Sequence, residues 1–488
     1  MFNAILIITS VNFRKNMNHF LNRQSLRKKL VLIFTIFANL STAYSNPNSV
    51  INFGATGNGI TDDTKAIQSA LNNNKIIYFP KGTYLVSSLI IGDNKKILTD
   101  GYSVILKQDN HSIGKQIIRI EGSNVSLAPL TCIGNISTDS SEFNIAIFVV
   151  PPFNHNTQNV IIKGLIAKDI RGDGICVGNS GGTYPENVTI ENITIENCYR
   201  NGISVVGGKN IVIRNVDVTH SGMEGIDIEG EGEKTVLLEN ISLTNVKAGN
   251  ICISGGSLRA KKITCSNITL DGKRQKSTPP FRPMNDAGIL IYNAEDVTIT
   301  KAVVKNMPGF AVFVGDIEAN QSLLCEGISI TDISLQNNAL TDKVYKAYMC
   351  VMGVHKISVN KLKAILNKEQ VLFLGKSNSF AGTQNVTISD SYVNGGKHLA
   401  QNCIIEAKNI SINTTGTCFF KMQEVTLVNS KIVCPMLGVT TTKMQASRKN
   451  PFNKSDIADN EPVVHIINTK INSKRVTKFS ANKHSWLL

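Results

Sequence analysis

Acidic side chains recur at matching places of a repeated phrase between residues 169 and 229. Asp173 and Glu224 each precede a glycine that opens the phrase, while Asp227 and Glu229 fall inside its third copy. Glycoside hydrolysis needs two carboxyl groups, one to protonate the leaving oxygen and one to activate water or attack the sugar. Asp173 and Glu224 are therefore the candidate hydrolytic pair. Repulsion from Asp227 and Glu229 would raise the pKa of Glu224, as a general acid requires.

A second chemistry is open because cations and proton acceptors lie in the same segment. β-Elimination or C5 epimerisation of a uronate needs a cation against the sugar carboxylate and a base for the C5 proton. Arg171 or Arg200 would supply the cation, and Tyr199 or His220 the base. His220 is equally well explained as a turn residue that hydrogen-bonds a backbone carbonyl.

Calcium is the one cofactor that the carboxylates suggest. Ca²⁺ held by Asp173, Asp227 or Glu229 would replace the arginine in elimination. A carboxylate cluster alone does not identify calcium, so we expect no cofactor and assign no metal ligand. The alternative for the whole group is an ordinary charged face, although stacked charges cost stability unless a function uses them.

The repeated phrase predicts the elements that position these residues. The phrase consists of glycine or asparagine followed by strand-forming residues, and its copies begin at 174, 202, 225, 250, 288 and 309. Two further rows of similar phrases come later in the successive coils. Coils of about 23 to 25 residues with three short strands each predict an all-β, right-handed parallel β-helix. Asn187-Val-Thr-Ile190 and Asn210-Ile-Val-Ile213 are members of the second row. Asn192-Ile-Thr-Ile195, Asn215-Val-Asp-Val218 and Asn240-Ile-Ser-Leu243 are assigned to the third.

Alternation along the phrase separates inward from outward side chains. Ile203, Ile226 and Ile251 would face inward, whereas Cys176, Ser204 and Asp227 would form one outward column. Adjacent coils are about 4.8 Å apart, so Asp173 and Glu224, two coils apart, would be about 9.5 Å from each other, at the long end of the range for inverting enzymes. The Asn-x-Thr/Ser phrases also match glycosylation acceptors, but a stacked ladder of turn asparagines explains them better.

The N-terminal segment carries a family resemblance. Residues 50–68 (VINFGATGNGITDDTKAIQ) and 77–84 (IYFPKGTY) resemble the opening of pectate-lyase-superfamily proteins, which include polygalacturonases, other polysaccharide hydrolases and lyases, and phage tailspikes. The match is specific over residues 50–106 and general to about residue 435. Asp62 and Asp63 are explained as first-turn acids of a short capping helix with Thr61 as N-cap, and Ile67 and Leu71 would close the end of the solenoid.

The resemblance also bears on the candidate site. Arg171-Gly-Asp-Gly-Ile175 resembles the Asn-Thr-Asp-Gly-Ile element of polygalacturonases, which matches Asp173 to a catalytic aspartate. The family's next aspartate is replaced by Asn201, and its Gly-His-Gly element by Met223-Glu224-Gly225, so a standard polygalacturonase is not expected. Tyr199-Arg-Asn-Gly-Ile203 loosely resembles a coil of alginate epimerases, whose Asp-Pro-His element is absent.

Two loops break the regular spacing and would wall a binding groove. Residues 179–186 contain Tyr184, and residues 271–286 are rich in basic side chains. A basic loop suits an anionic chain, and a solvated surface loop is the alternative. The substrate-binding candidates are Arg171, Glu229, Tyr184, Lys273, Arg274 and Arg282, with Lys276 in the same loop. Arg214 and Asp217 would form an exposed pair on a neighbouring face.

Residues 1–45 have the pattern of a cleaved signal peptide, with Met17 as an alternative start. Arg23, Arg27, Lys28 and Lys29 precede an apolar run from Leu30 to Leu40, and small residues flank Tyr44. We expect a secreted or periplasmic protein without a membrane span. The cap and first coils would occupy 46–106, the β-helix 107–435, and an irregular tail with one last strand near 463–467 would fill 436–488.

Charge and cysteine content narrow the partners. The formal net charge is +15, and the leader holds six basic and no acidic residues, which leaves about +9. Such a charge attracts polyanions such as uronate-bearing or sulfated glycans, and nothing indicates nucleic acid. All ten cysteines follow the leader without close pairs; Cys176, Cys252 and Cys265 fit buried thiols, and disulfide connectivity stays open.

The sequence thus predicts an exported enzyme that cleaves an acidic polysaccharide with a carboxylate pair. A lyase or C5-epimerase that uses arginine, tyrosine or histidine is the alternative chemistry. A non-catalytic, glycan-binding β-helix is the alternative class of protein.

Overall fold

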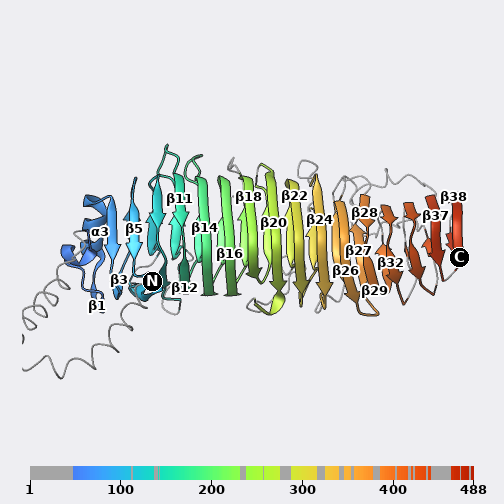
Figure 1. Ribbon diagram of the computed structural model, residues 1–488, viewed down its shortest axis with the longest axis horizontal. Coiled ribbons are helices and arrows are strands. Elements are labelled where there is room, and N and C mark those ends of the chain that lie inside the picture. The colour runs from blue at the N-terminus through green and yellow to red at the C-terminus, as the bar shows by residue number, and fades with distance from the viewer. Residues whose placement is uncertain are drawn as a thin grey trace, which may run out of the picture.

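Two long sheets of stacked strands run the length of the computed structural model (Figure 1). The structure describes residues 48–440 and 463–487, apart from 112–113, 137–140, 142, 231–237, 257, 275–286, 316–324, 340–345, 353–356, 377–384, 402–403, 416–418, 421–423, 436–437, 473 and 483–484. The leader expected at residues 1–45 therefore lies outside the described part. The predicted all-β class with parallel strands is confirmed. No helix within the described residues is long and apolar enough to cross a membrane.

One sheet, called the short-strand sheet below, takes one strand from each coil. Its strands are β4 (Leu89–Ile91), β7 (Ile118–Ile120), β10 (Ile147–Val149), β13 (Ile175–Val177), β15 (Ile203–Val205), β17 (Ile226–Glu229), β19 (Ile251–Ser254), β21 (Ile289–Tyr292), β23 (Val312–Val314), β25 (Ala347–Met352), β27 (Val371–Lys376), β30 (His398–Gln401) and β33 (Phe419–Phe420). Ile175, Ile203, Ile226, Ile251 and Ile289 pair in parallel, coil on coil. This is the first predicted row, and its register is confirmed for the phrases that begin at 174, 202, 225, 250 and 288. The phrase at 309–312 is misaligned by two residues, because Ile289 pairs with Val312 and not with Phe310.

The other sheet, called the long-strand sheet, holds the predicted second and third rows. In the middle coils the two rows fuse into single long strands, which are β14 (Glu186–Cys198), β16 (Gly208–Ser221), β18 (Leu238–Ala248), β20 (Ala260–Asp271), β22 (Ala294–Lys305), β24 (Ile328–Gln336) and β26 (Ile357–Leu366). Three separate strands per coil is therefore wrong for these coils. One residue with left-handed φ, such as Asn192 (61°) or Asn215 (57°), bends the strand. Because it is a single residue, coil-to-coil hydrogen bonds continue on both sides of it.

The end coils keep the two rows apart. The N-terminal strands are β1 (Asn58–Asp62), β2 (Ile76–Phe79), β3 (Gly82–Val86), β5 (Lys96–Thr99), β6 (Val104–Gln108), β8 (Val125–Leu127), β9 (Leu130–Ile133), β11 (Gln158–Ile162) and β12 (Leu165–Ile170). The C-terminal strands are β28 (Asn385–Ser389), β29 (Tyr392–Gly395), β31 (Ile404–Lys408), β32 (Ser411–Asn413), β34 (Glu424–Val428), β35 (Lys431–Val433), β37 (Val463–Ile471) and β38 (Lys474–Asn482). β37 pairs in parallel with β34, so the segment expected as a last strand continues this sheet. A small antiparallel pair consists of β36 (Gly438–Thr440) and β39 (Ser485–Leu487), and β36 contacts β33 of the short-strand sheet.

A second predicted register is also wrong. Asn240-Ile-Ser-Leu243 was assigned to the third row, but Ile241 pairs with Ile211 and Ile263, which belong to the second. Val246 takes the third-row position instead. Both rows start after a residue with left-handed φ (Asn210 at 56°, Asn245 at 55°), so the same Asn-Ile-Ser-Leu spelling fits either one. Most of the phrase expected in the second row, at 235–238, lies outside the described residues.

Aliphatic columns fill the interior. Ile203, Ile226 and Ile251 are at most 1% exposed, which confirms their inward assignment. Outside, the side-chain amide of Asn210 donates to Oδ1 of Asn187 (3.0 Å), and that of Asn215 to Oδ1 of Asn192 (3.0 Å). These bonds confirm the predicted asparagine ladder for those residues.

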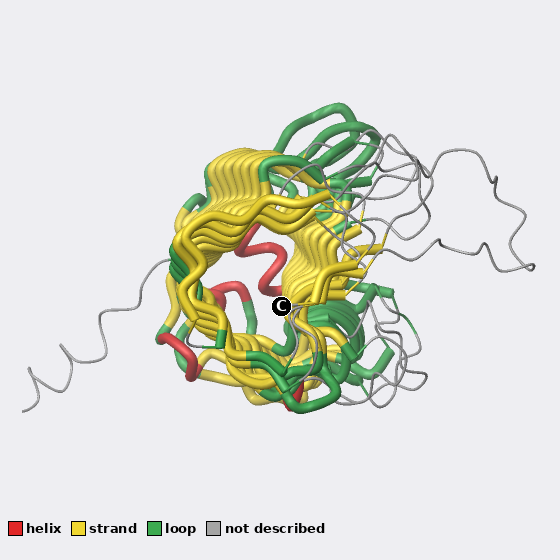
Figure 2. Tube along the Cα trace, turned by 90° about the vertical axis from the view of Figure 1, so that its right-hand side faces the viewer, coloured by secondary structure: helices red, strands yellow, loops and turns green. Residues whose placement is uncertain are grey.

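A helix lies across the N-terminal end of the solenoid (Figures 1 and 2). This is α3 (Thr64–Asn73), whose Ile67 and Leu71 are buried as predicted. Its N-cap is Asp63, so the predicted start at Thr61, which belongs to β1, is wrong. The Asp63 carboxylate accepts hydrogen bonds from the backbone of Thr56 (2.7 Å) and Gly57 (3.0 Å), and these bonds hold the preceding loop. Its role is structural, as expected. The other helices among the described residues are the 3-10 turns η1 (Val50–Phe53), η2 (Gly101–Ser103) and η3 (Gly272–Arg274).

Candidate active site

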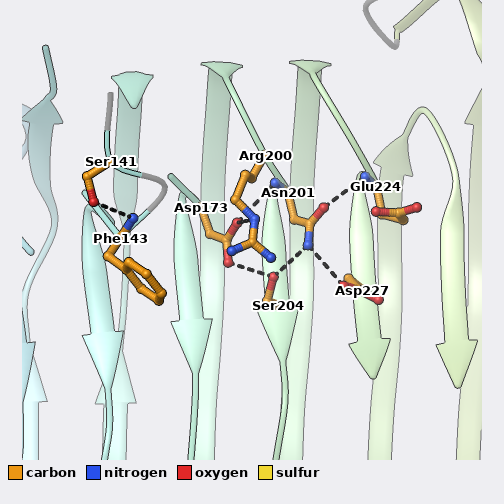
Figure 3. Close-up of polar contacts among 8 residues, drawn as sticks. All are labelled: Ser141, Phe143, Asp173, Arg200, Asn201, Ser204, Glu224 and Asp227. Carbon is orange, nitrogen blue, oxygen red and sulfur yellow. Dashed lines mark hydrogen bonds and ion pairs between the residues drawn. The ribbon is translucent and has the colours of Figure 1, made fainter. Parts of the chain in front are cut away.

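Four polar side chains meet on the outer side of the short-strand sheet (Figure 3). Asp173 and Asn201 immediately precede the phrases that hold β13 and β15, Ser204 lies in β15, and Asp227 lies in β17. Although they belong to outward columns, all four are 1–4% exposed. The outward columns are therefore closed to solvent at this point. Alternation assigns a side chain to a face but does not tell what covers that face.

Asn201 and Ser204 connect the two aspartates. The Ser204 hydroxyl donates to Oδ2 of Asp173 (2.8 Å), and the backbone N–H of Asn201 donates to Oδ1 (3.1 Å). The Asn201 side-chain amide donates to Oγ of Ser204 (3.0 Å) and to Oδ2 of Asp227 (2.9 Å). Its oxygen accepts from the backbone N–H of Glu224 (2.9 Å). One asparagine thus fixes residues from three consecutive coils, and we call Asp173, Asn201, Ser204 and Asp227 the polar network.

The predicted cations lie next to this network. Nε of Arg200 is 3.7 Å from Oδ1 of Asp173. The Arg171 guanidinium stacks on the ring of Tyr199, with its carbon 3.5 Å from the ring centroid. Tyr199 is 49% exposed, so this stack is open to solvent on one side. Arg171, Tyr199 and Arg200 therefore come together as predicted, but with partners of their own.

Burial sets the protonation of two acids. It is the main cause that raises the pKa of Glu224, and the charges of Glu229 and Asp173 add to it, whereas a backbone hydrogen bond and Arg200 act against it. Burial likewise raises the pKa of Asp227 well above its ordinary value, with Glu229 and Glu224 as further causes. The predicted direction for Glu224 is confirmed. Its main cause is loss of solvent rather than the crowding of charges that the sequence suggested.

Solvent reaches the acids unequally. Glu224 is half-buried and Glu229 is exposed, whereas Asp227 is almost fully enclosed. Oδ1 of Asp227 is buried and accepts no N–H or O–H hydrogen bond from the described residues. A protonated carboxyl group needs no donor at its hydroxyl oxygen, which agrees with the raised pKa of Asp227. Glu224 is thus the acid with a raised pKa that a ligand could reach.

Two other predicted residues lie outside the polar network. His220 is an exposed residue of β16 with a left-handed φ of 57°, opposite Asn197, whose φ is 64°. It therefore occupies a bend position of the coil, as its turn interpretation expects. Tyr184 lies in the loop between β13 and β14, where its backbone N–H donates to Oδ1 of Asn156 (3.3 Å).

The first residues of the basic loop, which are its described part, contact the long-strand sheet. The Arg274 guanidinium forms an ion pair with Asp217 of β16, and its Nε donates to the carbonyl of Val218 (3.0 Å). The predicted pairing of Arg214 with Asp217 is wrong. The coil register places Arg214 opposite Glu191, to which its Nε donates (2.8 Å). Lys273 and Arg274 are the last two described residues of this loop. Lys276 and Arg282 lie outside the described residues.

Sequence reasoning missed the central role of Asn201 and Ser204. Both stand in the predicted columns beside the acids, which is the signal that could have found them. An asparagine before a glycine is more readily explained as a turn residue. Across the described part of the chain, no three histidine, cysteine, aspartate or glutamate side chains converge in the arrangement of a metal site.

Residues 48–249 match the family model described as rhamnogalacturonase A/epimerase, pectate lyase-like. The uncharacterized protein YclG of Bacillus subtilis is 29% identical over 340 residues, which cover 59% of this chain and 54% of YclG. The chain spans about half or less of the length of the first curated relatives that it matches.

Solved structures share the fold at low sequence identity. The surface protein and adhesin PfbA of Streptococcus pneumoniae has a TM-score of 0.50 at 15% identity, covering 78% of this chain and 99% of PfbA. The pre-mature gene product 12 of bacteriophage phi29 has a TM-score of 0.51 at 15% identity, covering 91% of this chain and 60% of that one. The family match over residues 48–249 and the stacked parallel coils support a pectate-lyase-like superfamily.

Proposed function

We propose that this protein is an exported polysaccharide-active enzyme that hydrolyses glycosidic bonds of an acidic, uronate-type glycan. One observation carries the proposal: Asp173 and Glu224 lie two coils apart on one face but in opposite environments. Asp173 accepts hydrogen bonds from Ser204 and Asn201. Glu224 is half-buried and its pKa is raised. Paired carboxyl groups that differ in this way suit a general base and a general acid.

The roles follow from these environments. Glu224 would protonate the leaving oxygen, and Asp173 would activate the attacking water. A separation of two coils, about 9.5 Å, leaves room for that water and favours inversion at the anomeric carbon. Asn201, Ser204 and Asp227 would act as positioning residues. We take the coils to wind in the right-handed sense, since connections between parallel strands nearly always do.

Elimination or epimerisation is the alternative chemistry. It would use Arg171 or Arg200 against the substrate carboxylate and Tyr199 or His220 as base. In this geometry Arg171 stacks on Tyr199, and Arg200 lies beside Asp173. Tyr199 covers one face of the Arg171 guanidinium, and Asp173 partly offsets the charge of Arg200. We place hydrolysis first because Glu224, its general acid, is only half-buried and has a raised pKa.

A non-catalytic, glycan-binding role is the alternative of another class. It is favoured by the near-complete burial of the polar network, whose members hydrogen-bond to one another. Such a network can also serve only to hold three coils in place. Activity measurements separate the two classes.

Product analysis tests the proposal. The purified chain without its predicted leader is incubated with polygalacturonate, a sulfated glycan and a neutral glucan. Hydrolysis releases reducing ends without the ultraviolet absorbance of an unsaturated uronate, whereas a lyase produces both. Epimerisation changes the uronate NMR spectrum without cleavage. Binding without any of these products would support the non-catalytic class.

Isosteric variants then test the residues. Asp173→Asn and Glu224→Gln should each lower kcat by roughly 10²–10⁴-fold and leave substrate binding nearly unchanged. Glu196→Gln is the matched control, because Glu196 is an exposed partner of Lys168 on the long-strand sheet. Arg200→Ala should act mainly on binding. If Arg200→Ala or Tyr199→Phe abolished turnover while both acid variants stayed active, the elimination mechanism would replace this one.

A further inference from the structure

A groove follows the C-terminal coils of the long-strand sheet, away from the short-strand sheet that holds the polar network. It occupies the coils of β26, β29, β32, β35 and β37, orange to red in Figure 1. Its volume is about 1070 Å³. Each of the first four coils contributes its bend residue and the next two residues, as in 361–363 and 390–392, and the last coil contributes Asn468 and Lys470. The groove therefore extends along the axis of the solenoid.

The coil register orders the groove into columns. Lys363, Tyr392, Ser411, Lys431 and Lys470 pair in succession and form one outward column. Five coils at about 4.8 Å per step extend this column over roughly 19 Å. That length accommodates several sugar units of a linear polysaccharide laid along the axis.

Beside this column lies the column of bend residues. It consists of Lys361, Asp390, Asn409, Asn429 and Asn468, all with left-handed φ. Amide–oxygen hydrogen bonds join Asn409 to Asp390 (3.0 Å) and Asn468 to Asn429 (2.9 Å). The bends thus form a fixed polar edge along the groove.

The groove is positively charged. Its lining includes four exposed lysines, Lys361, Lys363, Lys431 and Lys470, and one acid, Asp390. Hydrogen bonds from Asn409 and Asn360 lower the pKa of Asp390, so it stays ionised and offsets one of the four positive charges. Tyr392, the second residue of the column, is 46% exposed, so its ring can support a sugar ring.

The same column has a different composition in the earlier coils. Going back from Lys363, the described register gives Ser334, Val303, Thr269, Lys247, Asp217 and Thr194. That stretch has one lysine and one aspartate, and the aspartate is already paired with Arg274. The concentration of lysines around an exposed tyrosine is thus confined to the coils that form the groove.

We infer that this groove binds an acidic polysaccharide laid along the solenoid axis. Lys363, Lys431 and Lys470 would contact the carboxylate or sulfate groups, Tyr392 would stack on a sugar ring, and the asparagine edge would bond to hydroxyl groups. The inference goes beyond the proposed function, since binding in the groove needs no turnover at Asp173 or Glu224. A groove and a cleavage site on separate sheets can hold a long chain at two places.

The test compares two triple variants of equal charge in the full protein. Lys363→Gln/Lys431→Gln/Lys470→Gln removes the three positive charges of the outward column. Lys75→Gln/Lys96→Gln/Lys107→Gln removes three exposed lysines from the N-terminal coils. Both also carry Asp173→Asn, so that polygalacturonate is not degraded during the measurement. Calorimetry at low and physiological salt gives Kd and its salt dependence for each.

The groove variant should bind polygalacturonate at least about tenfold more weakly and lose most of the salt dependence, while the N-terminal variant changes less than about twofold. Tyr392→Ala should weaken binding without altering the salt dependence. Polygalacturonate should also protect Lys363, Lys431 and Lys470 from acetylation, and neutral dextran should not. Equal effects of the two triple variants would overturn the inference, as would duplex DNA binding through these lysines as tightly as polygalacturonate.

Turnover distinguishes this inference from the proposed function. On an oligosaccharide too short to reach both sheets, the groove variant with Asp173 intact should retain wild-type kcat. If the wild-type protein cleaves nothing yet loses binding in the groove variant, the hydrolase proposal fails and the groove stands. If cleavage depends on Asp173 and Glu224 but the groove variant binds normally, only the groove inference fails.

Discussion

The short-strand sheet and the groove of the long-strand sheet place charged residues on the same kind of backbone grid, with opposite results. Asp173 and Asp227 are at most 4% exposed and bridged by Asn201 and Ser204. Lys363, Lys431 and Lys470 are exposed, and register alone aligns them. Burial fixes the positions of the acidic side chains and shifts their pKa values, and both effects are needed for the cleavage of a glycosidic bond. Exposure leaves charge mobile and hydrated, which suits reversible binding of a long polyanion.

The largest contrast should come from placing a charge inward rather than outward. Ile226→Asp puts an unpaired carboxylate in the aliphatic column, at a cost of about 4–5 kcal/mol or more, and should prevent soluble expression. Ser411→Asp adds the same group to the groove column, where solvent reaches it, and should fold normally. Expression yield and circular dichroism check both. A folded Ile226→Asp protein would contradict the inward assignment.

The second-largest difference between the two regions should come from removal of the Asn201 side-chain amide. Asn201→Ala leaves Asp227, Ser204 and the N–H of Glu224 without a shared partner and should lower the free energy of unfolding by about 1–3 kcal/mol or more. Lys431→Ala in the groove should change it by less than about 0.5 kcal/mol. Denaturant titrations followed by circular dichroism measure both. Similar losses of unfolding free energy in the two variants would show that the hydrogen bonds of Asn201 do not stabilise the three coils that they join.

The pH dependence of stability should have opposite signs in the two regions. The raised pKa of Asp227 means that its contribution to stability is complete only below the ordinary aspartate value of 3.8 and is lost as pH rises through the folded-state value. Each unit of that shift corresponds to about 1.4 kcal/mol. Asp227→Asn should therefore reduce the loss of stability between acidic and neutral pH.

The groove supplies the control for this measurement. Its Asp390 has a lowered pKa, so its contribution is present at neutral pH and is lost as pH falls through the folded-state value. Asp390→Asn should consequently change stability only slightly, and chiefly at neutral pH. Thermal unfolding across the pH range tests both variants. A wild-type protein whose stability rose from acidic to neutral pH as steeply as that of Asp227→Asn would contradict the raised pKa of Asp227.

The smallest effect should come from the ion pairs that decorate the long-strand sheet. Arg274→Gln breaks the contact with Asp217, and Arg214→Gln the contact with Glu191. Each should cost about 0.2–1 kcal/mol, because the pairs are partly exposed. Denaturation midpoints at low and high salt measure this. Losses comparable to that of Asn201→Ala would show that these contacts fasten coils as strongly as the polar network does.

Most of the first row was predictable because close contact between adjacent coils requires glycine at particular positions. A Cβ atom at Gly174 would lie 2.7 Å from the carbonyl oxygen of Gly202, and one at Gly202 would lie 2.4 Å from that of Gly225. A side chain at these two positions would collide with the next coil, and glycine precedes β13, β15, β17 and β21, where it marks the register. The capping helix was predictable for a similar reason, since Ile67 and Leu71 need an apolar surface.

Other features depend on information that the repeat does not hold. Asn240 begins a phrase that fits either the second or the third row. The length of the preceding turn determines which of the two rows the phrase joins. The partner of Asp217 comes from a loop 57 positions later in the chain, so local spacing suggested Arg214 instead. The burial of Ser204 and Asp227 depends on what covers an outward column. These three outcomes arise from long-range packing, whereas the glycines report on adjacent backbone.

The coil-on-coil hydrogen bonding also determines how the molecule would respond to force. Adjacent coils from Ile175 to Ile289 are joined strand to strand, and each contains 23 to 38 residues. Tension applied to the chain ends along the axis would load these bonds one row at a time, so rupture should proceed coil by coil. Each rupture would release roughly 8–13 nm of chain. The molecule would then behave as an extensible tether that gives way in steps.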